Sequence, residues 1–414
     1  MDIQKLTINE LALRVTEEMT KLGLSLNTIW CAYNASIVQI VRLHEKKNKK
    51  YYNRSIVTEY VRSVKKRKEN GELTDASYRR LMRGAERLTE LHDTGKLEWS
   101  CPGKVSKYKL TEYYENVIDE FIAAGEWHPN TLGDVTWVAR KFFAWLIQEK
   151  IENLCDVGAV EIQRFMINCA EHLRTNTMHD IQLYMRKICR YLFESGQLYD
   201  SYEALLSFKV SRESKMQPAI SQDEAALILD MIDRCTVKGK RDYAIILLGI
   251  VTGLRAVDIA KLRLSDIDWK TGEIKIVQSK TGRSLALPLT KDVGEAIKDY
   301  VLNGRRRTAS EFVFLRDRAP FNAFVNGVAI GNLYDSYRLK AGLPRDAFDG
   351  KGFHALRRSM GKNLVAAGTP VTTVAQVLGV ENIDSTKKYI SLDSKHLIEC
   401  ALDFAGIEGE AANE

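Results

Sequence analysis

Cysteine is scarce in this 414-residue sequence, and its seven cysteines are scattered without a CxxC pair. This spacing argues against a zinc site or a disulfide framework and predicts reduced thiols, as in a cytosolic protein. The seven histidines and the acidic residues form no HExxH or DxDxG pattern. The sequence therefore predicts neither a metal site nor a bound cofactor.

Long apolar runs are also missing. The longest, Tyr243–Leu254, is broken by Gly249 and Gly253 and is too short to span a bilayer. The first ten residues lack the apolar core of a signal peptide. We therefore expect no membrane partner and a cytoplasmic, nucleoid-associated location. Apolar residues make up 45% of the chain and charged residues 28%, which indicates a globular protein rather than a disordered or fibrous one.

The positive charge is confined to one end of the chain. Residues 1–106 contain 20 Lys and Arg against 13 Asp and Glu, whereas residues 107–414 contain 41 of each. Localised positive charge is typical of a nucleic-acid partner, although a solubilising surface is the alternative. The expected DNA contacts are Lys46, Lys47, Lys49, Lys50, Lys65, Lys66, Arg67 and Lys68, and a third basic cluster comprises Arg79, Arg80, Arg83 and Arg87.

Hydrophobic spacing predicts a mainly α, multidomain fold. One helix is expected over Thr28–His44, and four or five helices over 107–208, one of them capped by Asp156. Trp127, Trp137 and Trp145 of this second region are expected in its core. From residue 219 the pattern is again helical, and Ser221 with Glu224 predicts a capped helix start.

One clear β signal interrupts the last helical region. Glu273–Gln278 and Ser284–Leu289 alternate polar and apolar residues on either side of a turn at Ser279–Arg283. Pro288 limits the second strand to the edge of a sheet or to a strand end. The sequence therefore predicts a small antiparallel sheet within an otherwise helical domain.

Four short segments in this last region carry charged or nucleophilic side chains. Gly253 is expected to end an apolar helix, and Arg255 to begin the next one, three residues before Asp258. The turn of the hairpin reads SKTG, and a later segment reads HALRRS, where a histidine and an arginine three residues apart share a helix face. The fourth segment, STKKYIS, contains a tyrosine. Taken alone, each of these side chains has an ordinary structural explanation.

Together, these segments resemble the tyrosine recombinase (phage-type integrase) family. The motifs TGLRAVD, SKTGR, HALRRS and LGVENIDSTKKYI occur in the family's order, and the resemblance covers residues 219–405. It implies a helical core-binding domain over 105–210 and a mostly helical catalytic domain with a small antiparallel sheet over 215–405. Residues 1–104 resemble the basic arm-type DNA-binding domain of some integrases, and residues 406–414 form an acidic tail.

The resemblance implies cutting and rejoining of double-stranded DNA through a 3′-phosphotyrosine, without ATP or metal. Tyr389 would be the nucleophile, since an aryl ester of phosphate keeps the energy of the broken bond. Arg255 and Arg357 would clamp the phosphate oxygens with their forked donors. By the same resemblance, Lys280 is the general acid and His354 assists proton movement.

Two further positions are expected to support this chemistry, and a third to lie outside it. Asp258 would orient Arg255 or brace its helix. The family usually has a histidine or tryptophan nine residues before the tyrosine, where this chain has Val380. Loss of one such donor costs on the order of 10²-fold in rate. Arg358 is expected on the surface or at the DNA backbone.

The expected assembly is a homotetramer on DNA, bound at core sites and, through the basic domain, at arm sites. The expected role is integration or excision of a mobile element or prophage, and the need for a DNA-bending or directionality factor stays open. A catalytically weakened or inactive relative that only binds DNA is one alternative. A chromosomal resolvase or invertase is another, as is a topoisomerase-like relaxing enzyme.

Overall fold

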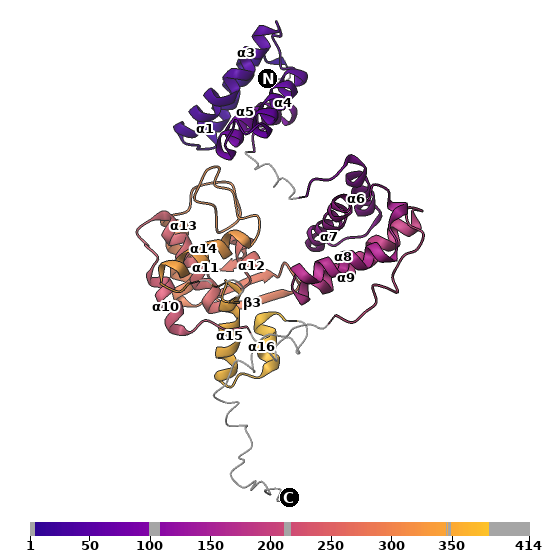
Figure 1. Cartoon of the computed structure of the whole chain (residues 1–414). Helices are drawn as coiled ribbons and strands as arrows, with labels where there is room; N and C mark the ends of the chain where they lie inside the picture. Colours follow the sequence, from indigo (N-terminus) through magenta and orange to yellow (C-terminus); the bar gives the residue numbers. More distant parts are fainter. Residues whose placement is uncertain (1–4, 99–107, 211–216, 345, 347–348, 381–414) are drawn as a thin grey trace, which may run out of the picture. The chain divides into compact units, whose positions relative to one another are not determined.

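The computed structural model describes residues 5–98, 108–210, 217–344, 346 and 349–380, which Figure 1 shows in colour. The chain divides into two compact units, Cys101–Lys215 and the remainder. Both are built mainly from helices, with one small sheet, which confirms the predicted mainly α class. Every helix in the described ranges is too short or too polar to traverse a lipid bilayer. The three predicted domains stay a prediction.

Residues 5–98 form helices whose apolar stripes meet in one cluster. Thr7 and Glu10 begin the first helix with a capping box. A π-helical turn, Tyr33–Ile37, interrupts the single helix predicted over 28–44, because hydrophobic spacing does not reveal a local change in hydrogen-bond register. The α-helices are α1 (Ile8–Lys21), α2 (Leu26–Ala32), α3 (Val38–Lys46), α4 (Arg54–Glu69) and α5 (Asp75–Thr94).

Residues 108–210 pack four helices around an aromatic core. Trp145 is buried, and Trp127 and Trp137 pack against the same cluster, which confirms the expected core role of all three. The largest fully buried rings are Tyr114, Phe142, Phe143 and Phe165, which form a chain of ring contacts. The helices are α6 (Glu112–Ala124), α7 (Pro129–Gln148), α8 (Ala159–His172) and α9 (Thr175–Glu194).

The predicted cap of α8 is wrong by two residues. Asp156 ends a short 3₁₀ helix, and α8 begins after Gly158 instead. The N–H of Gly158 donates to Oε2 of Glu161 at 2.9 Å, so the glutamate supplies the helix start with its polar partner. An acidic residue before an apolar run is therefore only a weak marker of the helix boundary.

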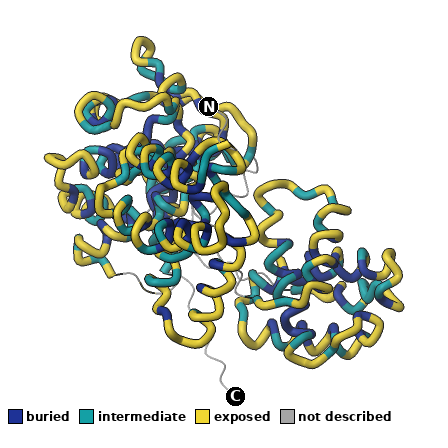
Figure 2. Tube along the Cα trace, turned by 90° about the horizontal axis from the view of Figure 1, so that it is seen from above, coloured by how far each residue is buried: buried dark blue, intermediate teal, exposed yellow. Residues whose placement is uncertain are grey.

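The described residues from 217 to 380 are organised around α11 (Val237–Thr252). Ten of its 16 residues are buried. Figure 2 colours the buried residues of the described chain dark blue along the Cα trace. Ser221 and Glu224 begin α10 with the predicted capping box. The helices that accompany α11 are α10 (Gln222–Asp230), α12 (Ala256–Ala260), α13 (Lys291–Asn303), α14 (Val328–Lys340), α15 (His354–Ala366) and α16 (Val371–Leu378).

The predicted hairpin is present within a three-stranded antiparallel sheet of order β1-β2-β3. β2 (Glu273–Val277) pairs with β3 (Ser284–Pro288) so that Glu273 lies opposite Pro288. Pro288 is therefore the last residue of an edge strand, as predicted. β1 (Ile267–Asp268) was not predicted, because two residues are too short for an alternating pattern.

Gly249 allows α11 to approach α15 closely. A Cβ atom at position 249 would lie 2.6 Å from Cζ of Phe353 and 3.3 Å from Cδ1 of Leu356. Since these two residues flank the start of α15, the small residue fixes the distance between the two helices.

We therefore expect Gly249→Ala to lower the free energy of unfolding by about 1–3 kcal/mol through overpacking. The matched control is Gly331→Ala in α14, where a Cβ atom would meet nothing within 4 Å. This substitution should stabilise the helix by up to about 1 kcal/mol, because alanine has a higher helix propensity than glycine. Urea unfolding of the full chain measures both. Equal changes in the two variants would contradict a contact-specific effect.

Candidate active site

Arg255 lies at the junction between α11 and α12. Gly253 ends α11 in the left-handed conformation and Arg255 is the N-cap residue of α12, as the sequence predicted. The arginine side chain is 17% exposed, and its Nη1 donates to Oε1 of Gln278 at 2.9 Å. The guanidinium is thereby directed toward the base of the hairpin.

Arg357 is held between the carboxyl ends of two helices. Its side chain is buried, and Nη1 donates to the carbonyl oxygen of Gly253 at 3.1 Å. Nη2 donates to the carbonyl oxygen of Leu378, at the end of α16. Carbonyl groups in the last turn lack intrahelical partners and form the negative end of the helix dipole, so they favour a cation at this point.

The two arginines are connected through Gln278 and the Leu378 carbonyl. Nε2 of Gln278 donates to the Leu378 carbonyl at 3.1 Å, and this is the same oxygen that accepts from Arg357. The structure thus brings together two guanidiniums that are far apart in the sequence. Gln278 was not singled out from the sequence, because a glutamine at a strand end carries no recognisable pattern.

Asp258 connects α12 to the hairpin. Its side chain is 1% exposed, and Oδ1 accepts the backbone N–H of Ser279 at 2.8 Å. Oδ2 lies 3.9 Å from Nη1 of Arg255 and has no hydrogen-bond partner among the described residues. The carboxylate therefore balances part of the arginine charge while it braces the turn that carries Lys280.

The remaining predicted residues lie in the hairpin turn, at the start of α15 and after α16. Lys280 lies exposed in the hairpin turn, and His354 is the exposed first residue of α15, three residues before Arg357. Val380 is half-buried and packs against the apolar cluster of Val374 and Leu378. Its side chain offers no hydrogen-bond donor. Tyr389 lies outside the described residues.

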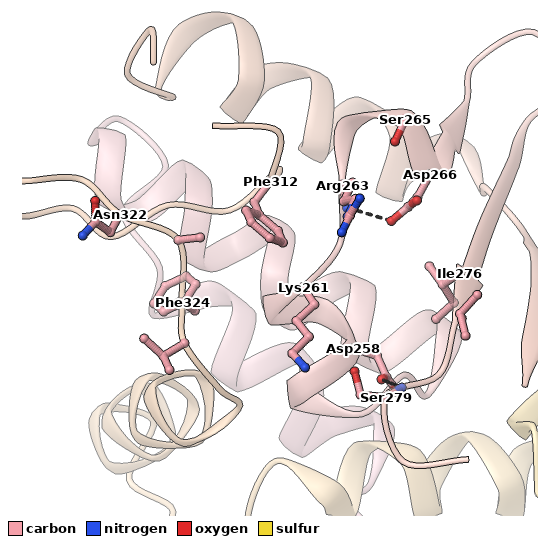
Figure 3. A pocket seen from close by; sticks show the side chains of 13 residues that line it. Asp258, Lys261, Arg263, Ser265, Asp266, Ile276, Ser279, Phe312, Asn322 and Phe324 are labelled. Carbon is pink, nitrogen blue, oxygen red and sulfur yellow. Dashed lines mark hydrogen bonds between the residues drawn. The ribbon is translucent and has the colours of Figure 1, made fainter. Parts of the chain in front are cut away.

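A cavity of about 800 Å³ lies beside the hairpin. Figure 3 shows Asp258 and Ser279 joined at its edge, with Lys261 and Arg263 on the same wall and Phe312 and Phe324 among the lining side chains. Asp258 lines this cavity, and its Oδ2 lies 3.9 Å from Nη1 of Arg255, so the cavity adjoins the Arg255 side of the site.

The expectation for Arg358 is wrong. Arg358 is only 4% exposed, and its Nε donates to the carbonyl oxygen of Pro218 at 2.9 Å. Further bonds go to Oε1 of Gln217 at 3.1 Å and to the carbonyl of Gly350. Adjacent residues on a helix point about 100° apart, so Arg358 faces a different part of the interior from Arg357. It fastens the segment before α10 to α15.

The predicted DNA-contacting residues of the first segment divide into two groups. Lys47 pairs with Glu59, Arg67 with Glu72, and Lys68 with Asp75. Exposed pairs of this kind contribute only about 0–1 kcal/mol, so they do not prevent these cations from binding a phosphate. The remaining five, all exposed, are Lys46, Lys49, Lys50, Lys65 and Lys66.

The basic cluster on α5 is also divided. Arg79, Arg80 and Arg83 are exposed and line a cavity of about 370 Å³ together with residues of α2. Arg87, by contrast, is buried and pairs with Glu90. Only the first three residues of this cluster therefore belong to the outer surface.

Comparison with known proteins supports one family. The model of the phage integrase family matches residues 218–396. The putative integrase/recombinase y4gC of Sinorhizobium fredii is 35% identical over 201 residues, which are 47% of this chain and 100% of that protein. The related y4rA of the same organism is 31% identical over 272 residues, 65% of each chain. Alignments with y4rA and y4rF span only 65% and 66% of those relatives' own length.

Solved structures share the fold. A lambda integrase dimer (residues 75–356) bound to a COC′ core site superposes with a TM-score of 0.53 at 16% identity, covering 69% of this chain and 97% of that one. XerH bound to palindromic difH substrate gives a TM-score of 0.54 at 16% identity, covering 83% and 95%. Given the family match, the full coverage of a relative at 35% identity and the motif order, the chain belongs to the phage integrase family of tyrosine recombinases.

Proposed function

We propose that this chain cuts and rejoins double-stranded DNA at specific sites by forming a 3′-phosphotyrosine bond to Tyr389. The observation that carries the proposal is the chain of hydrogen bonds that links Arg255 to Arg357 through Gln278 and the Leu378 carbonyl. Two oriented guanidiniums match the nonbridging oxygens of one phosphodiester, which gather negative charge in the transition state. Neither a metal ion nor ATP is needed for such a transfer.

The proposed step exchanges one ester bond for another. The phenolic oxygen of Tyr389 attacks phosphorus, the bond to the 5′-oxygen breaks, and a free 5′-hydroxyl leaves. Because a phenol has a pKa of about 10, a base must take its proton and an acid must protonate the leaving oxygen. Lys280 on the exposed turn is assigned the acid role, and His354, one helical turn before Arg357, assists proton movement. Attack by a different 5′-hydroxyl on the phosphotyrosine then completes strand exchange.

The partners follow from the relatives. Lambda integrase has been solved as a tetramer bound to a Holliday junction, and XerH bound to its difH substrate. By analogy we assign this chain a homotetramer on DNA, acting in integration or excision of a mobile element or prophage. The names of the Sinorhizobium relatives, putative integrase/recombinase, support this role.

One observation favours a second candidate function, a weakened or inactive relative that only binds DNA. Val380 packs into the apolar cluster at the end of α16, where the family usually has a hydrogen-bonding ring. The exposed His354 offers a polar group elsewhere in the site. We therefore favour the enzyme.

Covalent trapping separates the two functions. The probe is a nicked duplex that carries the target site, which direct repeats flanking the gene would identify, and it is incubated with the full chain. We expect a protein–DNA adduct that survives denaturation and protects the 3′ end. Specific binding without any adduct would support the DNA-binding relative instead.

The basic residues of the first segment are expected to act on accessory DNA. Neutralising Lys46, Lys47, Lys49 and Lys50 should weaken binding to arm-site DNA and lower the salt slope by about 0.9 for each lost phosphate contact. The matched variant neutralises Arg79, Arg80 and Arg83. Filter binding at several salt concentrations measures both. A change in core-site binding alone would contradict an arm-type role for these lysines.

A further inference from the structure

Gln278 is a fully buried polar side chain at the point where β2 enters the hairpin turn. Its Oε1 accepts from Nη1 of Arg255 and from Oγ1 of Thr281, both at 2.9 Å. Its Nε2 donates to the Leu378 carbonyl at 3.1 Å. The orientation of the amide is dictated by its partners, because a guanidinium can only donate and a carbonyl can only accept.

The glutamine completes a chain of hydrogen bonds between the two arginines. The Leu378 carbonyl accepts from both Gln278 and Arg357, so the sequence of contacts is Arg255, Gln278, Leu378 and Arg357. The third partner, Thr281, follows Lys280 in the turn. The amide of Gln278 therefore contacts Arg255 itself, the carbonyl that also binds Arg357, and the turn that carries Lys280.

The surrounding backbone is shaped to admit this amide. Gly379 ends α16 with φ +57°, and a Cβ atom there would lie 2.5 Å from Nε2 of Gln278. The backbone of Gln278 is itself fixed, since its N–H donates to Arg283 at 2.8 Å and its carbonyl accepts from Gly282 at 2.9 Å. A buried amide with three satisfied partners and a glycine beside it is held in one orientation.

We propose that Gln278 is a positioning residue that fixes the orientation of Arg255 relative to Arg357 for binding the scissile phosphate. The inference rests on the proposed function and adds a residue to it. Gln278 does not need to touch DNA, because it acts through the guanidinium of Arg255. An apolar side chain of the same length would fill the space but leave Arg255 and the Leu378 carbonyl without this partner.

The test replaces the amide by an uncharged side chain of equal length, Gln278→Met. In single-turnover cleavage of the nicked duplex we expect a rate about 10- to 100-fold lower, the loss typical for a hydrogen bond to a charged group. The dissociation constant for the duplex should stay within about threefold, because Gln278 acts through Arg255 rather than on the DNA backbone. The matched control is Gln376→Met, since Gln376 lies exposed on α16 and should cleave at the wild-type rate.

A double-mutant cycle distinguishes positioning from a general effect on folding. If Gln278 acts through Arg255, Gln278→Met should change the cleavage rate less than about twofold in an Arg255→Ala background. A full 10- to 100-fold loss in that background would overturn the proposal. So would a wild-type cleavage rate in the single variant.

A readout without catalysis keeps this proposal separate from the proposed function. In DNA-free protein, nitrogen-15 NMR of the arginine side chains should show the Nε–H signal of Arg255 shifted or broadened by Gln278→Met, and unchanged by Gln376→Met. An unchanged Arg255 signal in Gln278→Met overturns the positioning role. Failure of the wild-type chain to form any adduct overturns the proposed function instead, and the NMR result then decides the positioning role alone.

Discussion

Tyr389→Phe is expected to abolish the covalent protein–DNA adduct while leaving the affinity for core-site DNA within a few-fold of wild type. The substitution removes a single oxygen atom, which is the one that forms the bond to phosphorus. Without this oxygen, the two arginines still bind the phosphate, but the protein cannot form an ester bond to the phosphorus. Cleavage of the nicked duplex, followed on denaturing gels, should fall below detection, a loss of at least about 10⁴-fold.

A second tyrosine provides the control for this substitution. Tyr199 is 80% exposed and lies in the unit Cys101–Lys215, so Tyr199→Phe removes an equivalent phenol far along the sequence from the motifs. It should form the adduct at the wild-type rate. An adduct that persists in Tyr389→Phe would assign the nucleophile to another residue and refute the motif alignment at this position.

Arg255→Ala and Arg357→Ala are each expected to lower the cleavage rate by about 10³-fold or more, with DNA affinity changed much less. The reason is that the negative charge on the phosphate oxygens is greatest in the transition state, so the guanidiniums stabilise that state more than the bound substrate. Substitution by lysine should restore little, because an ammonium lacks the planar fork of donors. Single-turnover cleavage and equilibrium binding on the same duplex separate the two effects.

The neighbouring Arg358 gives a sharp comparison for Arg357. Both are buried, but Arg358 bonds to Pro218, Gln217 and Gly350, away from the Leu378 carbonyl. Arg358→Ala should therefore lower the melting temperature and leave cleavage per folded molecule nearly unchanged. Wild-type cleavage by Arg357→Ala, or a specific loss in Arg358→Ala, would reject the assignment of the two guanidiniums.

Local features of this protein were predictable because their causes are local. A glycine after an apolar run ended α11 and placed Arg255 at the start of α12, as expected. Ser221 and Glu224 begin α10 with the predicted capping box. The alternation of polar and apolar residues on either side of a glycine-containing turn correctly predicted the hairpin. The predictions missed or misplaced features whose sequence pattern is weak. These are the two-residue strand β1, the π-helical turn, and the cap of α8.

Residue types in a fixed order were enough to assign the family and to propose the chemistry, because a phosphoryl transfer requires particular side chains wherever the backbone carries them. Contacts between distant segments were decided only by the folded chain. The ends of α11 and α16 meet at the base of the hairpin. This arrangement decides that Arg357, and not the adjacent Arg358, is linked to Arg255, and it places Gln278 between the two linked arginines. That meeting follows from the packing of the interior, where burial and unpaired carbonyl groups select partners that no neighbouring residue in the sequence reveals.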